Sequence, residues 1–175
     1  NSKLPALTSG QNRIVFMGDS ITEFWSALSP DFFAGKPYVN RGISGQTSPQ
    51  MLVRFRADVI ALKPKIAVIL AGANDIAGNT GPSTLEMITD NIFSMAELAK
   101  AHQIKVILCS VLPAYDFDWK PGSFPAEKIL RLNKMIKQYA DANEILYLDY
   151  YSALVDERKG LKAAYADDGV HPNKA

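Results

Sequence analysis

Short apolar runs alternate along this chain with segments whose apolar residues recur every three or four positions. Five runs have the length of a β-strand, namely residues 14–17, 38–43, 66–71, 106–112 and 145–148. The third run, IAVILA, is apolar throughout, which is typical of a strand buried on both faces. Strands that alternate with helices indicate βαβ units. We therefore predict an α/β fold with a parallel sheet covered by helices on both faces.

The intervening segments carry apolar stripes with helical spacing, which we expect to pack in the core. Ser48 and Pro49 suit the N-cap and first position of one helix, and Pro64 ends it. Residues 113–123 (PAYDFDWKPGS) form the longest stretch without either period, and loops of this size are often functional. The stripes are Leu52, Phe55, Val59 and Leu62; Leu85, Ile88, Ile92, Met95 and Ala99; and Ile129, Leu132, Ile136 and Tyr139.

Length and composition indicate a single globular domain. The chain has 175 residues, of which 47% are hydrophobic and 21% charged. Nineteen basic and eighteen acidic residues, without a basic run, argue against a nucleic-acid partner. No apolar stretch reaches the roughly 18 to 20 residues that a membrane span needs. Cys109 is the only cysteine, so no intramolecular disulfide can form.

Chemistry-bearing residues follow four of the predicted strands, where ligands bind in an open α/β sheet. Gly18-Asp19-Ser20 follows the first strand and precedes a helical run, 21–28. A serine at a helix N-terminus suits a nucleophile, because N–H groups there favour developing negative charge, although the triplet alone more often marks an N-cap. Gly42 in NRGISG either lets backbone approach a ligand or forms a turn. Asn74 in GAND either donates to an oxyanion or is a turn residue.

The two histidines have different surroundings. A serine needs a base to attack a carbonyl, and histidine, with an unperturbed pKa of about 6.5, suits that role. His102 ends the long helix after Pro82, where interaction with the helix dipole is the simpler interpretation. His171 lies in a non-helical segment three residues after Asp168. This spacing would let the carboxylate accept one imidazole N–H while the other nitrogen faces a serine.

Together, and in this order, the segments GDSIT, NRG, GAND and DGVHP resemble the four blocks of the SGNH branch of the GDSL-type esterases and lipases. The resemblance spans almost the whole chain. It implies a three-layer α/β/α, flavodoxin-like fold with a five-stranded parallel sheet, in one domain over residues 1–175. Related chains usually continue with a helix beyond the histidine, so we expect this domain to lack part of its C-terminal helix.

The resemblance also implies a serine esterase or acylhydrolase that acts on carboxylic ester bonds through an acyl-serine. It assigns Ser20 as the nucleophile, His171 as general base and then acid, and Asp168 as the residue that orients His171. The N–H groups of Ser20 and Gly42 and the side chain of Asn74 would hold the oxyanion. This chemistry needs no cofactor or metal, and the spacing of histidine and cysteine fits no zinc site.

The substrate is less clearly indicated. We expect short acyl groups, chiefly acetyl, on a small-molecule or glycan ester. Candidate substrate-binding residues are Asp19, Tyr115, Trp119 and one of the pair Phe24 and Trp25, although core packing is the stronger expectation for Trp25. A glycan ester would favour a periplasmic or secreted location slightly over the cytoplasm. The sequence does not determine the oligomeric state.

Other functions remain open. A lysophospholipase or thioesterase would use the same site on a different ester. A non-catalytic carbohydrate-binding module of the same fold is less favoured, because all the proposed catalytic positions are present together. A phosphate or flavin binder is also less favoured, because the first turn is acidic and lacks a glycine-rich cradle.

Overall fold

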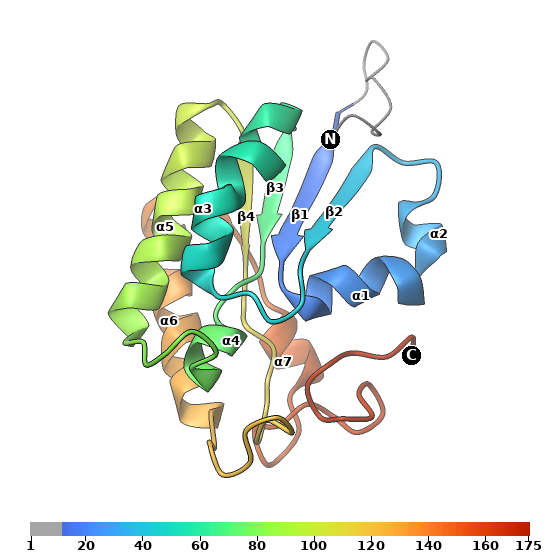
Figure 1. The fold of residues 1–175 in the computed structure, drawn as a ribbon, viewed down its shortest axis with the longest axis vertical. Coiled ribbons are helices and arrows are strands. Elements are labelled where there is room, and N and C mark those ends of the chain that lie inside the picture. Colours follow the sequence, from blue (N-terminus) through green and yellow to red (C-terminus); the bar gives the residue numbers. More distant parts are fainter. Residues whose placement is uncertain (1–11) are drawn as a thin grey trace.

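The computed structural model describes residues 12–175, which form a five-stranded, all-parallel sheet between two layers of helices (Figure 1). The sheet order is β2-β1-β3-β4-β5, which confirms the predicted α/β, flavodoxin-like fold. The predicted domain also included residues 1–11, which lie outside the described part. The strands are β1 (Ile14–Gly18), β2 (Tyr38–Gly42), β3 (Ile66–Ile69), β4 (Lys105–Cys109) and β5 (Leu146–Leu148).

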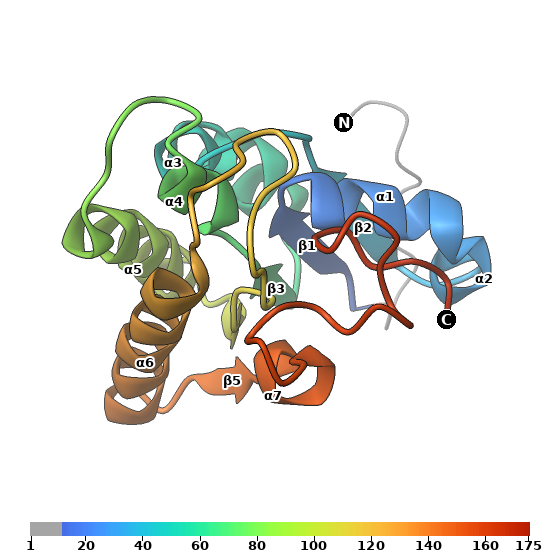
Figure 2. The same cartoon turned by 90° about the horizontal axis from the view of Figure 1, so that it is seen from below.

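Helices cover both faces of the sheet, as Figures 1 and 2 show. One face carries α1 (Ser20–Leu28), α2 (Pro30–Phe33) and α7 (Tyr150–Leu154). The other carries α3 (Ser48–Asp58), the short 3₁₀ helix η1 (Ile60–Leu62), α5 (Leu85–Ala101) and α6 (Ala126–Ala142). The short helix α4 (Ala73–Ala77) follows β3. Over residues 12–175, none of the helices has both the length and the apolar composition needed to cross a membrane.

Strand side chains alternate between two cores. In β1, Val15 and Met17 join the larger core under α3, α5 and α6, whereas Ile14 and Phe16 face α1 and α2. The three predicted stripes are buried in the larger core or packed against it. Each central strand therefore contributes apolar side chains to both faces, as its continuous apolar sequence predicts.

Strands β3 and β4 are shorter than the apolar runs that predict them. The runs continue past the strand ends at Ile69 and Cys109, and the following residues remain buried. Buried Asn133 of α6 takes the place of a strand partner there, because its Oδ1 accepts the Val111 N–H at 2.7 Å and its Nδ2 donates to the Val111 carbonyl at 2.9 Å. The Asn133 side chain thus satisfies the hydrogen-bonding groups of buried backbone beyond the end of β4.

Helix α3 begins one residue earlier than predicted and ends sooner. Its N-cap is Thr47, whose N–H donates to Gln50 Oε1 at 2.9 Å, so Ser48 lies within the helix. The apolar stripe continues through η1, and the chain turns at Lys63, with a φ of 48°, just before Pro64. The turn therefore comes where Pro64 predicts the end of the helix. The break between α3 and η1 is not predicted from the sequence.

The last four residues, 172–175, are not helical. Together with Trp25, Cys109 and Tyr150 they line a largely apolar groove of about 250 Å³ beside α1. That the domain lacks part of its C-terminal helix stays a prediction.

Candidate active site

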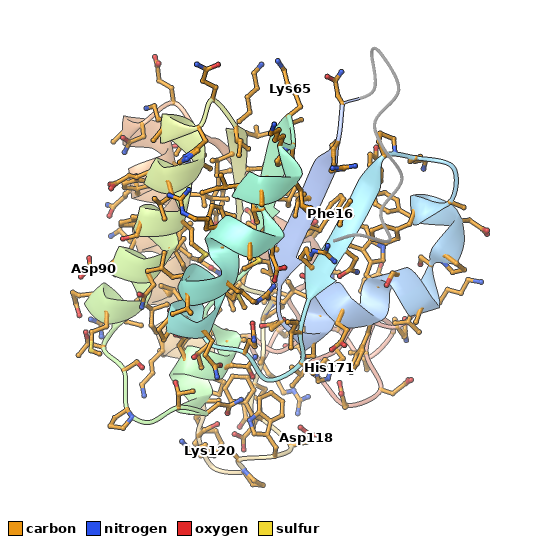
Figure 3. The ribbon with its side chains drawn as sticks, turned by 45° about the horizontal axis from the view of Figure 1, so that its top comes forward. Phe16, Lys65, Asp90, Asp118, Lys120 and His171 are labelled. Atoms are coloured by element: carbon orange, nitrogen blue, oxygen red, sulfur yellow. The ribbon has the colours of Figure 1, made fainter. Side chains whose placement is uncertain are left out.

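The predicted chemical segments meet at the carboxyl-terminal edge of the sheet. Ser20 follows β1 as the first residue of α1, and Asn74 follows β3 in α4. Because β1 and β3 are neighbours at the point where the strand order reverses, their ends leave space for a ligand. Figure 3 shows His171 at this edge and Lys65 at the opposite one.

Ser20, His171 and Asp168 form one hydrogen-bonded chain. Ser20 Oγ lies 2.8 Å from His171 Nε2, and His171 Nδ1 lies 2.6 Å from Asp168 Oδ2. A carboxylate can only accept hydrogen bonds, so Nδ1 carries the proton and Nε2 is the acceptor for the serine hydroxyl. The arrangement can therefore take a proton from Ser20 as its oxygen attacks.

Backbone groups of its own turn fix Asp168. Its Oδ1 accepts the N–H groups of Val170 and His171 at 2.9 and 2.8 Å, and Val170 is buried in the larger core. Partial burial acts to raise the pKa of Asp168, but the hydrogen bonds from His171 and Val170 outweigh it and lower that pKa below its ordinary value. Asp168 is therefore ionised at neutral pH and holds His171 in one orientation.

Asp19 does not face a substrate, contrary to the prediction from the sequence. It is only 2% exposed, and its Oδ1 caps α1 by accepting the Ile21 N–H at 3.0 Å. Its Oδ2 lies 3.3 Å from Asn74 Nδ2. Burial raises the pKa of Asp19 to about 6. Asp19 is thus a buried cap that touches the proposed oxyanion donor.

Asn74 is buried, with its amide turned toward the nucleophile segment. Its Nδ2 donates to the Gln46 carbonyl at 3.0 Å and to Asp19 Oδ2 at 3.3 Å. Its Oδ1 accepts from Asn79 Nδ2 at 2.8 Å. One amide hydrogen therefore points to Asp19, the residue before Ser20, and the other to the turn after β2, so the amide nitrogen lies beside the nucleophile segment where an oxyanion donor is required.

Gly42 is not available in the role that the sequence predicts. Its N–H donates to Asn40 Oδ1 at 2.8 Å, so it is not free for an oxyanion. A Cβ at Gly42 would lie 2.1 Å from the Glu23 nitrogen. The glycine is needed because β2 passes close to the first turn of α1, and the assignment of Gly42 as an oxyanion donor is wrong.

The turn after β2 contains a second glycine, which the sequence reasoning missed. Gly45 has a φ of 74°, and a Cβ there would meet nothing within 4 Å. The carbonyls of Gly45 and Gln46 lie 3.5 and 3.0 Å from the side-chain amides of Asn79 and Asn74. The turn therefore lies against the Asn74 amide. The motif NRGISG contains both glycines, and only packing distinguishes them.

Two exposed aromatic side chains flank His171. The rings of Phe24 and Trp119 lie 5.4 and 6.3 Å from its imidazole, and each residue is 42% exposed. Trp25 instead packs against Phe16 at 5.3 Å in the smaller core. Core packing is therefore the correct interpretation for Trp25, and Phe24 is the aromatic residue of α1 beside the site.

Tyr115 lies near Asp168, the acidic residue of the hydrogen-bonded Ser20–His171–Asp168 chain. It lines a hollow of about 290 Å³ together with Asp168 and Gly169. The guanidinium of Arg158 lies 5.2 Å from its ring centre. Tyr115 thus remains a candidate substrate contact on the Asp168 side of the site.

The remaining histidine and the cysteine take no part in the site. His102 is exposed at the end of α5, where its Nδ1 lies 2.8 Å from the Leu98 carbonyl. Cys109 is buried, and burial raises the pKa of its thiol to about 12, so it is a poor nucleophile. In the described part of the chain, no three acidic, histidine or cysteine side chains converge as metal ligands.

Comparison with known proteins identifies the class. The model of the GDSL-like lipase/acylhydrolase family matches residues 16–175, so the chain belongs to that family and is a hydrolase that acts on esters. A crystal structure of a GDSL-like lipase from Bacteroides thetaiotaomicron superposes with a TM-score of 0.95, at 50% sequence identity, over 98% of this chain and 85% of that one.

Two curated relatives are more distant. The esterase TesA of Pseudomonas aeruginosa is 27% identical over 170 residues, which cover 95% of this chain and 78% of that protein. The acetylxylan esterase of Geobacillus stearothermophilus is 24% identical over 191 residues, which cover 93% of this chain and 87% of that protein.

Proposed function

We propose that this protein is a serine esterase that removes short acyl groups, chiefly acetyl, through an acyl-serine intermediate. The observation that carries the proposal is the chain from Ser20 Oγ through the His171 imidazole to Asp168, with distances of 2.8 and 2.6 Å. His171 takes the proton as Ser20 attacks the ester carbonyl, and returns it to the leaving alcohol. Water then attacks the acyl-serine by the same route.

The oxyanion lies between groups of three elements in this proposal. The Ser20 N–H, in the first turn of α1, needs no acceptor within the helix. Asn74 supplies a side-chain N–H: the one that donates to Asp19 Oδ2, its longer bond at 3.3 Å, exchanges that bond for one to the oxyanion. The Gly45 N–H, in the turn against Asn74, takes the place assigned to Gly42 from the sequence.

The alcohol that carries the acyl group, and leaves as His171 protonates it, is proposed to be a carbohydrate. Support comes from the exposed rings of Phe24 and Trp119 near His171, which suit the apolar face of a sugar. Similarity to an acetylxylan esterase supports the same class. Because polysaccharide esters lie outside the cytoplasm, we also propose that the enzyme is exported.

Hydrolysis of 4-nitrophenyl acetate and octanoate, by the parent and by Ser20→Ala, tests the proposal. We expect a preference for acetate, and a kcat for Ser20→Ala lower by about 10⁴-fold or more, because the nucleophile is lost. Ser26→Ala, which removes an exposed hydroxyl from the same helix, is the matched control and should retain parental kcat.

Each other outcome has a definite meaning. A preference for octanoate would replace the short-acyl proposal with a lysophospholipase- or thioesterase-like one. Full activity in Ser20→Ala would refute the serine mechanism. A parent without turnover that still binds acetylated xylo-oligosaccharide would indicate a binding module, whereas release of acetate from that oligosaccharide supports the carbohydrate proposal.

Asn74→Ala tests the oxyanion hole separately. Removing one oxyanion donor typically lowers kcat by about 10² to 10³-fold, and we expect a loss in that range with an unchanged fold. Steady-state kinetics and circular dichroism check both parts. A folded variant with parental kcat would remove Asn74 from the mechanism.

A further inference from the structure

Asn79, in the turn after α4, joins the proposed oxyanion donor to an aromatic residue of the 113–123 loop. Its Nδ2 donates to Asn74 Oδ1 at 2.8 Å, and its Oδ1 accepts the Trp119 Nε1–H at 3.2 Å. A backbone bond of 3.0 Å, from the Asn79 N–H to the Asn74 carbonyl, reinforces the link. Its Nδ2 also lies 3.5 Å from the Gly45 carbonyl. Asn79 itself is exposed, so its three side-chain bonds are not a requirement of core packing.

The hydrogen-bond partners of Asn79 and Asn74 determine which end of each side-chain amide is the oxygen and which is the NH₂. An indole N–H can only donate, so the oxygen of Asn79 faces Trp119 and its NH₂ faces Asn74. The oxygen of Asn74 then faces Asn79. Its NH₂ is left for the Asp19 carboxylate and the Gln46 carbonyl, both of which accept.

We propose that Asn79 is a positioning residue that orients and polarises the Asn74 amide for the oxyanion. The inference rests on the proposed function, in which Asn74 donates to the developing negative charge. The bond from Asn79 is made to the amide oxygen, and it prevents the rotation that would present this oxygen to the oxyanion. A donor on the oxygen also strengthens the hydrogen-bonding power of the NH₂ at the other end.

The Trp119 end of this arrangement is anchored. Its ring stacks on buried Phe117, with centroids 4.7 Å apart and an interplanar angle of 22°. The neighbouring Lys120 amine donates to the Ala77 carbonyl at the end of α4. Contacts with Phe117 and with the end of α4 thus fix Trp119 and Asn79 relative to the helix that carries Asn74.

The Asn79→Asp variant tests the bond to Asn74 separately from the bond to Trp119. The variant keeps an oxygen for the Trp119 indole but replaces the donor to Asn74 with a second acceptor, which repels the Asn74 oxygen. We expect kcat for 4-nitrophenyl acetate to fall by about tenfold or more, but less than in Asn74→Ala, with KM within about twofold. Asn143→Asp is the control, since the Asn143 Nδ2 also donates to a neighbouring group, the Tyr139 carbonyl at 2.9 Å, but at the end of α6.

A double variant distinguishes positioning from a general structural effect. Once Asn74 is alanine, Asn79 has no amide to orient and Asn79→Asp removes only the longer contact with the Gly45 carbonyl, at 3.5 Å. Adding Asn79→Asp to Asn74→Ala should therefore lower kcat by a several-fold smaller factor than in the parent. An equal loss in both backgrounds, or a parental kcat in Asn79→Asp, would overturn the inference.

Side-chain amide NMR provides a readout that needs no activity. The Asn74 NH₂ pair is identified by its disappearance from the ¹⁵N–¹H spectrum of Asn74→Ala, and it should shift in Asn79→Asp but not in Asn143→Asp. An unmoved pair would overturn the inference even if the esterase proposal stands. A shifted pair in a protein that proved not to be a serine esterase would uphold the orientation of Asn74 and refute only its catalytic use.

Discussion

A buried carboxylate directly before the proposed nucleophile is costly, and its surroundings show why it is kept. Asp19 caps α1 and lies 3.3 Å from the Asn74 amide, so it serves the helix and the oxyanion donor together. Burial raises its pKa, the neighbouring charge of Asp75 adds to that effect, and the Ile21 N–H and His171 oppose it. The residue favours local geometry at the expense of stability.

Asp19→Asn should show that cost as a function of pH. The pKa of Asp19 is raised from 3.8 to about 6, so the folded state binds more protons between these values and its free energy of unfolding falls as pH rises through them. An asparagine at position 19 does not titrate, so the variant does not lose this stability as pH rises. Its free energy of unfolding relative to the parent should rise by about 2 kcal/mol between pH 4 and pH 7.

Urea denaturation at several pH values measures this difference. Asp31→Asn, which changes an exposed aspartate on α2, is the control. A difference between Asp19→Asn and the parent that does not vary with pH would contradict the assignment of a costly ionised Asp19.

At the scale of elements, a single carboxylate organises the 113–123 loop. Asp116 accepts the Gly122 and Ser123 N–H groups at 2.6 and 3.0 Å and the Ser123 hydroxyl at 2.8 Å. These bonds, with the Gly122 N–H first, hold the pKa of Asp116 well below its ordinary value. The loop therefore keeps its shape without helix or strand, and it presents Trp119 beside His171.

Asp116→Ala should loosen this loop while the helices stay protected. We expect several-fold faster proteolytic cleavage within 113–123, and faster amide exchange there but not in α5 or α6. Asp118→Ala is the matched control, because Asp118 Oδ1 accepts only the neighbouring Trp119 N–H, at 2.8 Å. Equal cleavage in the two variants would show that Asp116 does not organise the loop.

The lowered pKa gives the parent loop a defined response to acid. Because the folded-state pKa of Asp116 is lowered, its stabilising bonds are present above the ordinary aspartate range and are lost only as pH falls through the lower value. Loop protection in the parent should therefore persist to about pH 4, the ordinary range of aspartate. Loss of protection between pH 6 and pH 5 would contradict this account.

At the scale of the whole molecule, the sheet separates two cores of different size. The larger core lies under α3, α5 and α6, and the smaller one is built from aromatic side chains that surround Phe16. The candidate active site lies at the edge of the sheet, outside both cores. Substitutions of its half-buried members Ser20 and His171 should therefore change activity with little effect on folding.

Two substitutions on α3 test the contribution of the larger core. Phe55 is fully buried and Val53 is 87% exposed on the same helix. Phe55→Ala should lower the free energy of unfolding by about 3 to 5 kcal/mol, because it leaves a cavity, whereas Val53→Ala should change it by no more than about 0.5 kcal/mol. Urea denaturation monitored by circular dichroism compares them, and equal effects would refute this packing.

The sequence by itself determined the order and type of the elements and the set of residues in the hydrogen-bonded chain. Apolar period and strand length are properties of neighbours along the chain, so they predict the sheet and its helices directly. The spacing of Asp168 and His171 is also local, because both belong to one turn. Such features need no knowledge of what packs against them.

Only the tertiary structure decided which of several similar residues faces the site. Gly42 and Gly45 lie in one motif, but the Gly42 N–H is taken by Asn40 and its surface by α1. In the same way, the packing of α1 on the sheet turns Trp25 toward the smaller core and leaves Phe24 beside His171. These outcomes depend on contacts between segments far apart in the chain, and a local pattern carries no information about such contacts.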